Sequence, residues 1–446
     1  MRRRLAEETI LFVSIFKWFI IASAVGALVG FSTTAFLKTL SWSTAYADKY
    51  SYFFLLLPVA FFLSSFITKY LAPEAEGHGT EKVIEAIHRR SGHIKVLVVP
   101  VKLLTTVITL ATGGSAGKEG PCAQIGGGVS SILADILKFD NADRKKLVIC
   151  GISAGFASVF GTPIAGAIFG IEVLFIGVIM YDVLLPSFIA GVVGYQVSAA
   201  FGIEYFYHPI DFVPAFSELF FMKVILAGIF FGLCSLSLIE GMKLFKKLAD
   251  KINVWEPVKG LIGGAALVIL AFVFSTRYLG LGLETIESAL EGQSVAWWSF
   301  PVKIVFTCIT LTFGGSGGMV TPLFFVGATA GSLFANIMGL DLATFAGIGM
   351  VCLLAGSANT PIAASILAVE LFGPQVAPYA AVACVASFLM TGHRSVYPSQ
   401  VLAMKKSSSI DVEMGKEVEE IRAKFQLRKR SLVRIIFSYW RKLFGR

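Results

Sequence analysis

The chain has 446 residues, of which 56% are hydrophobic and 15% charged, and its formal net charge is +9. Soluble domains carry about 25% charged residues, so this composition excludes most classes of water-soluble protein and favours an integral membrane protein. The positive charge gathers at the chain ends, because residues 2–4 are arginines and residues 405–446 hold twelve Lys or Arg against five acids. This placement flanks a membrane region and argues against a nucleic-acid partner.

Long apolar stretches predict membrane helices along the chain. A span needs roughly 20 apolar residues, and residues 10–37, 51–72, 176–201 and 219–241 satisfy this requirement. The first stretch lacks a small-residue cleavage site, so we interpret it as a membrane helix rather than a signal peptide. The basic ends predict a multi-pass protein of the cell membrane, in contact with lipid, with both termini cytoplasmic. The basic and aromatic stretch 430–446 lies along an anionic membrane surface or forms a solvated tail.

The sequence repeats itself in two halves. Residues 100–121 align without gaps with residues 301–322, so that Lys102 matches Lys303. The junction between the halves has acids but no Lys or Arg, which places it outside the cell. A half that begins inside and ends outside crosses an odd number of times, so the second half must be inverted. We therefore predict an all-α polytopic membrane protein with a first membrane repeat at 1–202, an extracellular junction at 203–217, a second, inverted repeat at 218–403 and a basic cytoplasmic tail at 404–446.

Glycine-rich breaks interrupt the apolar chain at residues 77–79, 113–121 and 314–322. Irregular backbone at membrane depth is tolerated only where protein buries it or where it lines a cavity. A helix that starts there points unpaired N–H groups and the positive end of its dipole at the cavity, and both favour an anion. Inverted repeats with broken helices carry their binding site near the bilayer midplane. The breaks therefore predict a midplane anion site.

A serine hydrolase is a remote alternative. Residues 113–117 match G-x-S-x-G, with Ser115 as the nucleophile and His78 or His393 as the base. That elbow needs a strand before it and a helix after it, and the pattern recurs at 314–318, so we expect no enzyme. An ATP-binding loop is discarded because the residue after Lys118 is Glu119 instead of Ser or Thr. The six cysteines have no metal-ligand spacing, so neither a metal nor a cofactor is expected.

Four motifs in order resemble the CLC family of chloride channels and transporters, over roughly residues 10–403. They are GHGTE at 77–81, GKEGP at 117–121, GGMVTP at 317–322 and SVYPSQ at 395–400, where the family has GSGIPE, GREGP, GxFxP and a late tyrosine. The resemblance implies the CLC fold of two inverted repeats with broken helices that meet at a midplane anion site. It also implies a homodimer with one pathway per subunit. About forty residues follow the membrane region, too few for the family's C-terminal CBS domains.

The resemblance assigns roles to single residues. Glu119 would be the gating, proton-accepting glutamate, which competes with the anion when charged and can swing away once it is protonated. Tyr397 would donate its hydroxyl to the central anion, and Lys102 would add positive potential. The remaining anion-binding positions would be His78, Gly79, Lys118, Gly120, Met319 and Val320.

Three residues depart from the family pattern. His78 replaces the serine that contacts the central anion, and our hypothesis is that it makes anion binding depend on pH. Val320 replaces an aromatic residue, which would widen the pore. Val173 follows Glu172 at the proton-relay position, where proton-coupled exchangers often have a second glutamate. Valine is typical of a channel there, but not every exchanger has the relay residue.

The sequence thus predicts the transport of a small inorganic anion. Chloride is favoured by GKEGP and Tyr397, and fluoride or nitrate are the alternatives because of His78. A chloride channel and a chloride/proton exchanger, with protons as a second partner, both stay open. A transporter of organic anions is a third interpretation, which the same motifs disfavour.

Overall fold

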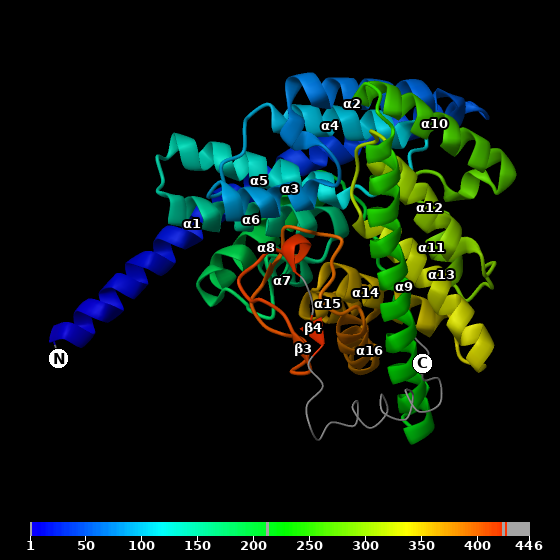
Figure 1. Cartoon of the computed structure of the whole chain (residues 1–446). Coiled ribbons are helices and arrows are strands. Elements are labelled where there is room, and N and C mark those ends of the chain that lie inside the picture. The colour runs from blue at the N-terminus through cyan, green and yellow to red at the C-terminus, as the bar shows by residue number, and fades with distance from the viewer. Residues whose placement is uncertain (1, 211–213, 422–423, 426–446) are drawn as a thin grey trace.

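The computed structural model describes residues 2–210, 214–421 and 424–425. Most of the basic tail expected at 404–446, including the stretch 430–446, lies outside these residues. The described part contains sixteen α-helices and four short strands (Figure 1). The N-terminal half contains α1 (Arg2–Ala47), α2 (Leu57–Leu71), α3 (Gly79–Arg89), α4 (Val98–Ala111), α5 (Glu119–Ile136), α6 (Asn141–Phe160), α7 (Pro163–Glu172) and α8 (Leu184–Ala200). The C-terminal half contains α9 (Glu218–Lys251), α10 (Glu256–Val273), α11 (Leu283–Leu290), α12 (Ser299–Thr312), α13 (Val320–Met338), α14 (Leu342–Ala358), α15 (Pro361–Phe372) and α16 (Ala377–Met390).

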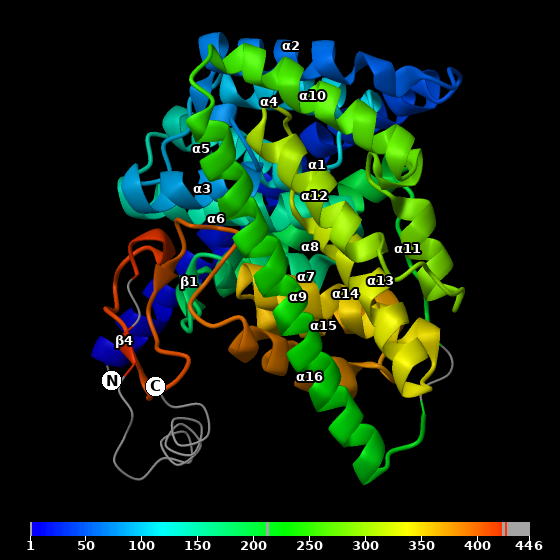
Figure 2. The ribbon, with the colours of Figure 1, turned by 45° about the vertical axis from the view of Figure 1, so that its right-hand side comes forward.

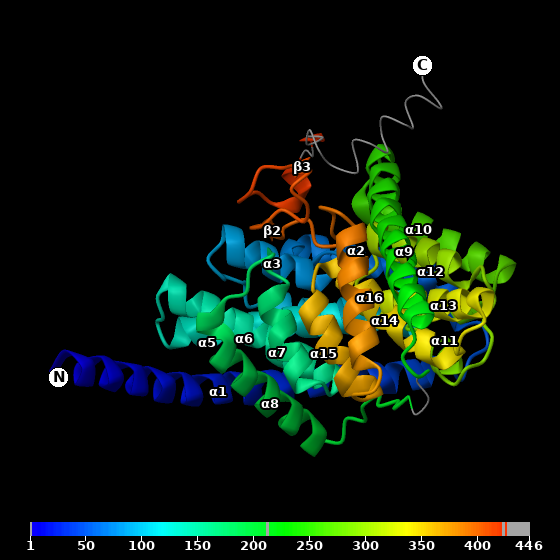
Figure 3. The ribbon, with the colours of Figure 1, turned by 90° about the horizontal axis from the view of Figure 1, so that it is seen from below.

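The helices of the two halves correspond one to one, as expected for two repeats. Each half begins with its longest helix, α1 or α9, and has a short helix, α3 or α11, in third place. Equivalent helices also pack together across the halves: α2 lies beside α10 (Figure 2), and α7 packs on α15. Within each half the first helix packs on the last, and Figure 3 shows α8 crossing α1. The expected helical fold of inverted repeats with broken helices is therefore confirmed.

The expected spans have different bounds in the structure, and the first and third differ in ways that matter for the fold. Helix α1 has 46 residues and is thus about 69 Å long, so its N-terminal part extends beyond the body of the protein (Figures 1 and 3). The stretch 176–201 is not one helix, because β1 (Phe175–Ile176) and a turn with Gly177 at φ 90° precede α8. Helices α10 and α13 are also long and apolar enough to span a membrane. The sequence analysis did not predict these two spans, because glycines interrupt both apolar stretches.

Small residues allow the helices of each half to pack closely. A Cβ atom on Gly327 of α13 would lie 2.3 Å from the backbone oxygen of Gly349 on α14. The equivalent crossing of α5 and α6 has Gly126 and Gly151, where an added Cβ on Gly126 would lie 2.2 Å from the Gly151 oxygen. Lipid gives helices little hydrophobic reason to associate, so this close van der Waals packing contributes much of the stabilisation.

Reciprocal hydrogen bonds connect the halves. The Ser115 amide donates to the Thr310 hydroxyl over 3.0 Å, and the Ser316 amide donates to the Thr109 hydroxyl over the same distance. The carboxylate of Glu172 at the end of α7 accepts the Ile362 and Ala363 amides at the start of α15. Glu370 of α15 accepts the Ile164 and Ala165 amides at the start of α7 in the same way. Each half therefore satisfies backbone donors that the other half leaves open at its helix starts.

The chain after Tyr397 forms a strap, defined here as residues 398–421, against the N-terminal half. Its strand β2 (Val401–Leu402) pairs in parallel with β1, with Phe175 opposite Val401. The strap then folds back on itself, because Val418 N donates to Gln400 O over 2.8 Å. Strands β3 (Ile410–Asp411) and β4 (Lys424–Phe425) form a second, antiparallel pair. The strap thereby anchors the Tyr397 loop to the end of α7.

We expect Gly327→Ala to destabilise the protein by about 1–3 kcal/mol, because overpacking a tight contact costs this much. The measurement is thermal unfolding of the purified protein in detergent. Gly241→Ala on α9 is the matched control, since its added Cβ would meet only Cys308 and Ile304 side-chain atoms at 3.4 Å. Equal melting temperatures for the two variants would contradict the proposed role of the α13–α14 crossing.

Candidate functional site

The starts of α3, α5 and α13 meet in the centre of the protein. Gly117, before α5, exchanges two backbone hydrogen bonds with Gly318, before α13, over 2.7 and 2.6 Å. His78, before α3, forms a parallel bridge with Gly317. The three glycine-rich breaks identified in the sequence are therefore brought together, each at the start of a helix.

Glycine is required where these segments touch. A Cβ atom on Gly79 would lie 2.4 Å from the Gly120 backbone oxygen, and one on Gly318 would lie 2.6 Å from the Gly120 amide nitrogen. Both atoms belong to backbone that cannot move aside. The close approach places the N-terminal ends of three helices around one point, where their dipoles favour negative charge.

Glu119 lies across the start of α13. Its side chain is buried, one carboxylate oxygen accepts the Thr321 amide over 3.1 Å, and the other accepts the Thr321 hydroxyl. Met319 and Val320, which begin α13, are buried beside it. The carboxylate thus occupies a helix start of the kind that would bind an anion, which is the closed arrangement expected of a gating glutamate.

Two cavities are lined by residues of this centre or of the loop next to it. A cavity of about 490 Å³ is lined by Lys118, Glu119 and Thr321 together with residues of the 204–208 segment. A cavity of about 640 Å³ is lined by Ser395 and Pro398 on either side of Tyr397, and by three lysines of α9, which are Lys243, Lys246 and Lys247. Glu119 therefore lines the first cavity, and the loop that carries Tyr397 lines the second.

His78 and Tyr397 face each other in the centre, with their ring centroids 5.7 Å apart. His78 Nδ1 and the Tyr397 hydroxyl are both buried, and neither makes a hydrogen bond of standard geometry within the described residues, although the Thr80 side chain lies close to the tyrosine hydroxyl. A buried polar atom without a partner costs about 1–3 kcal/mol. Two such atoms side by side indicate a site whose ligand supplies the missing partner.

Lys102 is fully buried and does not extend toward a membrane surface. Its ammonium donates to the backbone oxygens of Ala75 and Gly77 in the turn before α3. Lys303, its counterpart in the second half, donates to the oxygens of Tyr278 and Gly280 before α11. Each lysine therefore holds the turn that aims a short helix, in addition to any positive potential it supplies.

The relay position is apolar and buried. Val173 directly follows α7, and its backbone oxygen accepts a hydrogen bond from Gln400 over 2.8 Å. Glu172 beside it caps α15, as described above. Gln400 also accepts hydrogen bonds from Asn359 and Ser395, and the Ser395 hydroxyl in turn accepts the Tyr397 amide. A buried polar network thus connects the relay position to the Tyr397 loop.

Ser115 of the G-x-S-x-G pattern is fully buried, and its hydroxyl pairs with the Thr307 hydroxyl at 3.1 Å. Its equivalent, Ser316, pairs with the Thr106 hydroxyl at the same distance. The two serines therefore connect the halves. Within the described residues, no three His, Cys, Asp or Glu side chains gather as a metal site would require.

Sequence reasoning missed Thr321, Glu81 and Ser399. Thr321 follows Met319 and Val320, and its place in the first turn of a helix aimed at the site was the available signal. Glu81 is the last residue of GHGTE, and its carboxylate accepts the Ser399 amide over 3.0 Å. No local pattern connects residues so far apart in the chain.

Comparisons with known proteins agree with this geometry. Residues 60–392 match the family described as voltage gated chloride channel. The chain is 36% identical over 90% of its length, and 90% of the relative's, to the chloride/fluoride channel protein of Pseudomonas syringae pv. tomato. It is 27% identical to the H(+)/Cl(-) exchange transporter ClcA of Klebsiella pneumoniae, with 78% of this chain and 80% of the relative covered.

A solved structure of a CLC-type fluoride/proton antiporter superposes with a TM-score of 0.83 at 26% identity, covering 88% of this chain and 99% of that one. The family match covers well over half of the chain and the fold agrees throughout. The chain therefore belongs to the CLC family of voltage-gated chloride channels and related transporters, and it is a membrane anion-transport protein.

Proposed function

We propose that this protein exchanges fluoride for protons across the cell membrane, through a pathway gated by Glu119. The observation that carries the proposal is the pair of buried, unpartnered polar atoms on His78 and Tyr397. An imidazole N–H and a phenol O–H offer two hydrogen bonds to one small anion. Fluoride is the smallest halide and the strongest hydrogen-bond acceptor among them, and an anion leaving water must recover its lost hydrogen bonds in the site.

The comparisons support fluoride over the chloride that the motifs favoured. A chloride/fluoride channel protein and a fluoride/proton antiporter are both similar to this chain over most of its length. In the proposed site, Tyr397 and His78 bind the central anion. Gly79, Lys118, Gly120, Met319 and Val320 contribute backbone and positive potential around it.

Glu119 would couple the anion to protons. When charged, its carboxylate accepts a hydrogen bond from the Thr321 amide. An anion bound at the start of α13 would need the same hydrogen bond. When protonated, it loses the charge that the helix start favours and can leave. One position thus serves either the carboxylate or an anion, which makes proton binding and anion binding depend on each other.

We further propose that the protein is a homodimer with cytoplasmic termini. Exposed apolar side chains lie on four helices that pack on one another, α7, α8, α15 and α16, and examples are Ile164, Leu185, Ile362 and Val385. A second copy or lipid would cover them. Cross-linking in native membranes tests the dimer.

Liposomes loaded with potassium fluoride test the transport reaction. We expect outward fluoride movement to drive protons inward against their gradient, as followed by a fluoride electrode and a pH electrode. Fluoride should move at least about tenfold faster than chloride, a difference of about 1.4 kcal/mol. Glu119→Gln should abolish proton movement. Fluoride efflux in the presence of a potassium ionophore without any accompanying proton movement would instead indicate a channel, and faster chloride than fluoride would contradict the proposed anion.

His78→Ser should reduce the preference for fluoride over chloride by about tenfold, because one of the two donors becomes shorter and no longer reaches the same point. The pH dependence of anion binding should also fall. His88→Ser is the matched control, since His88 lies at the other end of α3 and its ring contacts the Leu174 backbone oxygen. An unchanged preference and pH profile in His78→Ser would remove His78 from the site.

Thr321→Val should raise the apparent affinity for fluoride by about tenfold or more. The hydroxyl's hydrogen bond to the Glu119 carboxylate contributes about 1.5–3 kcal/mol, and losing it releases the carboxylate that competes with the anion. Titration calorimetry measures the affinity. Thr329→Val on the same helix is the control, because the Thr329 hydroxyl bonds only to α13's own backbone. An unchanged affinity would show that Thr321 does not hold the gate.

A further inference from the structure

A fluoride/proton exchanger needs a group that accepts protons from the cytoplasmic side, and the relay position cannot supply it. Val173 is apolar and fully buried. The neighbouring Glu172 has both carboxylate oxygens committed to the first amides of α15, at 3.0 and 2.8 Å. If the proposed exchange holds, the protons take another route.

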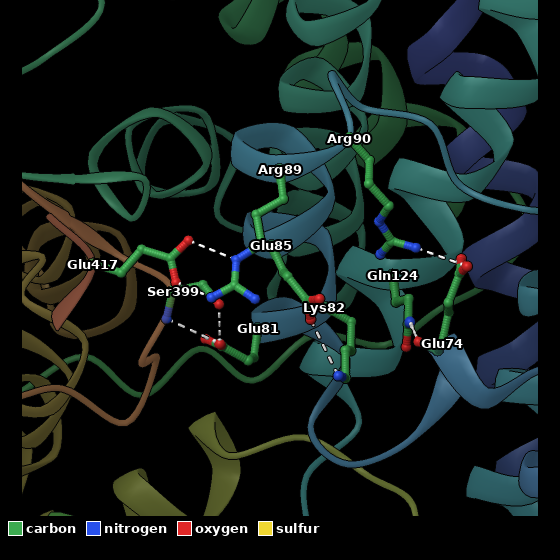
Figure 4. A network of polar contacts seen from close by, with 9 residues as sticks. All are labelled: Glu74, Glu81, Lys82, Glu85, Arg89, Arg90, Gln124, Ser399 and Glu417. Atoms are coloured by element: carbon green, nitrogen blue, oxygen red, sulfur yellow. Dashed lines mark hydrogen bonds and ion pairs between the residues drawn. The ribbon is translucent and has the colours of Figure 1, made fainter. Parts of the chain in front are cut away.

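Glu81 is a carboxylate with a free oxygen close to the centre. It lies in the first turn of α3, and its amide donates to the His78 backbone oxygen over 3.1 Å. One carboxylate oxygen accepts both the amide and the hydroxyl of Ser399 on the strap (Figure 4). The other oxygen, Oε2, is buried and has no hydrogen-bond partner within the described residues. Glu81 as a whole is mostly buried and keeps a small exposed surface, through which the proposed route would admit a proton.

The surroundings of Glu81 suit a group that gains and loses a proton near neutral pH. Helix α3 is not among the helices long and apolar enough to span a membrane. Burial raises the pKa of Glu81 to about 7, against the opposing hydrogen bonds from Ser399. The charged neighbours on α3 are Lys82 and Glu85, which pair with each other at 3.1 Å and nearly cancel.

Unpartnered polar atoms continue from Glu81 toward Glu119. Tyr397 lies two residues before Ser399, the residue that binds Glu81, and its hydroxyl is buried. His78 Nδ1 faces the same tyrosine. A hydroxyl and an imidazole can each accept a proton on one side and release one on the other.

We propose that Glu81 is the inner proton-accepting residue of this exchanger, and this inference rests on the proposed function. A cytoplasmic proton binds Oε2, so that an O–H bond forms and the carboxylate becomes neutral. That bond breaks when the proton passes by way of Tyr397, His78 or intervening water to the Glu119 carboxylate. Glu81 then regains its negative charge, and Glu119 becomes neutral and leaves the start of α13.

The strap holds Glu81 in place for this transfer. Arg89, at the far end of α3, forms a two-pronged ion pair with Glu417 of the strap (Figure 4). Ser399 binds Glu81 at the near end. Helix α3 is therefore fixed to the Tyr397 loop at both ends, which keeps the distance from Glu81 to the centre constant while protons move.

Glu81→Gln is the decisive variant, because glutamine can still accept both Ser399 hydrogen bonds but cannot carry a proton. In liposomes with a fluoride gradient, we expect proton movement to fall by about 100-fold and the proton-to-fluoride ratio to fall with it. Glu85→Gln, one turn along α3, is the matched control and should keep the ratio. An unchanged ratio in Glu81→Gln would overturn the proposal and leave Glu81 as a positioning residue. A wild-type protein that moves no protons would refute the proposed exchange itself.

Ser399→Ala keeps the inference testable if Glu81→Gln does not fold. It removes one hydrogen bond that favours the charged carboxylate, so the pKa of Glu81 rises and proton-coupled transport should continue to higher pH. The pH profile of the rate, measured on both sides of neutrality, shows the shift. A profile identical to that of the wild type would contradict the role of Glu81.

Discussion

The structure depends on bare backbone buried at the centre of an apolar protein. Three helices start there, and their first amides need acceptors that lipid cannot provide. Gly117 and Gly318, which directly precede two of these helices, satisfy their own amides by bonding each other, and Glu119 accepts a hydrogen bond from the Thr321 amide in the first turn of α13. The remaining open donors are what an anion would bind. The need to satisfy backbone therefore creates the site, and the glycines are present because any side chain would separate the segments.

The repeat makes this centre rigid. Because each half supplies the acceptors that the other half lacks, neither half can close its helix starts alone. Two kinds of contact each occur twice, once in each direction between the halves. One is the amide-to-hydroxyl bond of a serine in a break to a threonine of the other half. The other is the carboxylate of Glu172 or Glu370 that accepts amides at a helix start of the other half. Lys102 and Lys303 show where the symmetry ends. Both hold a turn, but only the turn held by Lys102 leads to a helix, α3, that starts at the site.

Much of the fold followed from the sequence, because glycine-rich breaks and the repeat are local patterns. The same breaks located Glu119 and His78 at helix starts. The extent of α1 and the helical course of α10 did not follow, since packing on neighbours decides whether a glycine interrupts a helix. Thr321 was missed because a threonine in a first turn has the same local pattern whether it bonds its own helix or a carboxylate of the other half. The contact of Glu81 with Ser399 joins distant segments, and only tertiary structure reveals it.

In the proposed mechanism, the gate and the coupling have one physical origin. The Thr321 amide can serve the Glu119 carboxylate or an anion, but not both, so any change that neutralises Glu119 opens the site to an anion. Coupling then requires only that protons reach Glu119 from each side. From the first cavity they meet it directly. In the route proposed for the other side, the strap binds a second carboxylate, Glu81 of α3, through Ser399. That route needs no glutamate at Val173, because the fold provides a carboxylate on another helix.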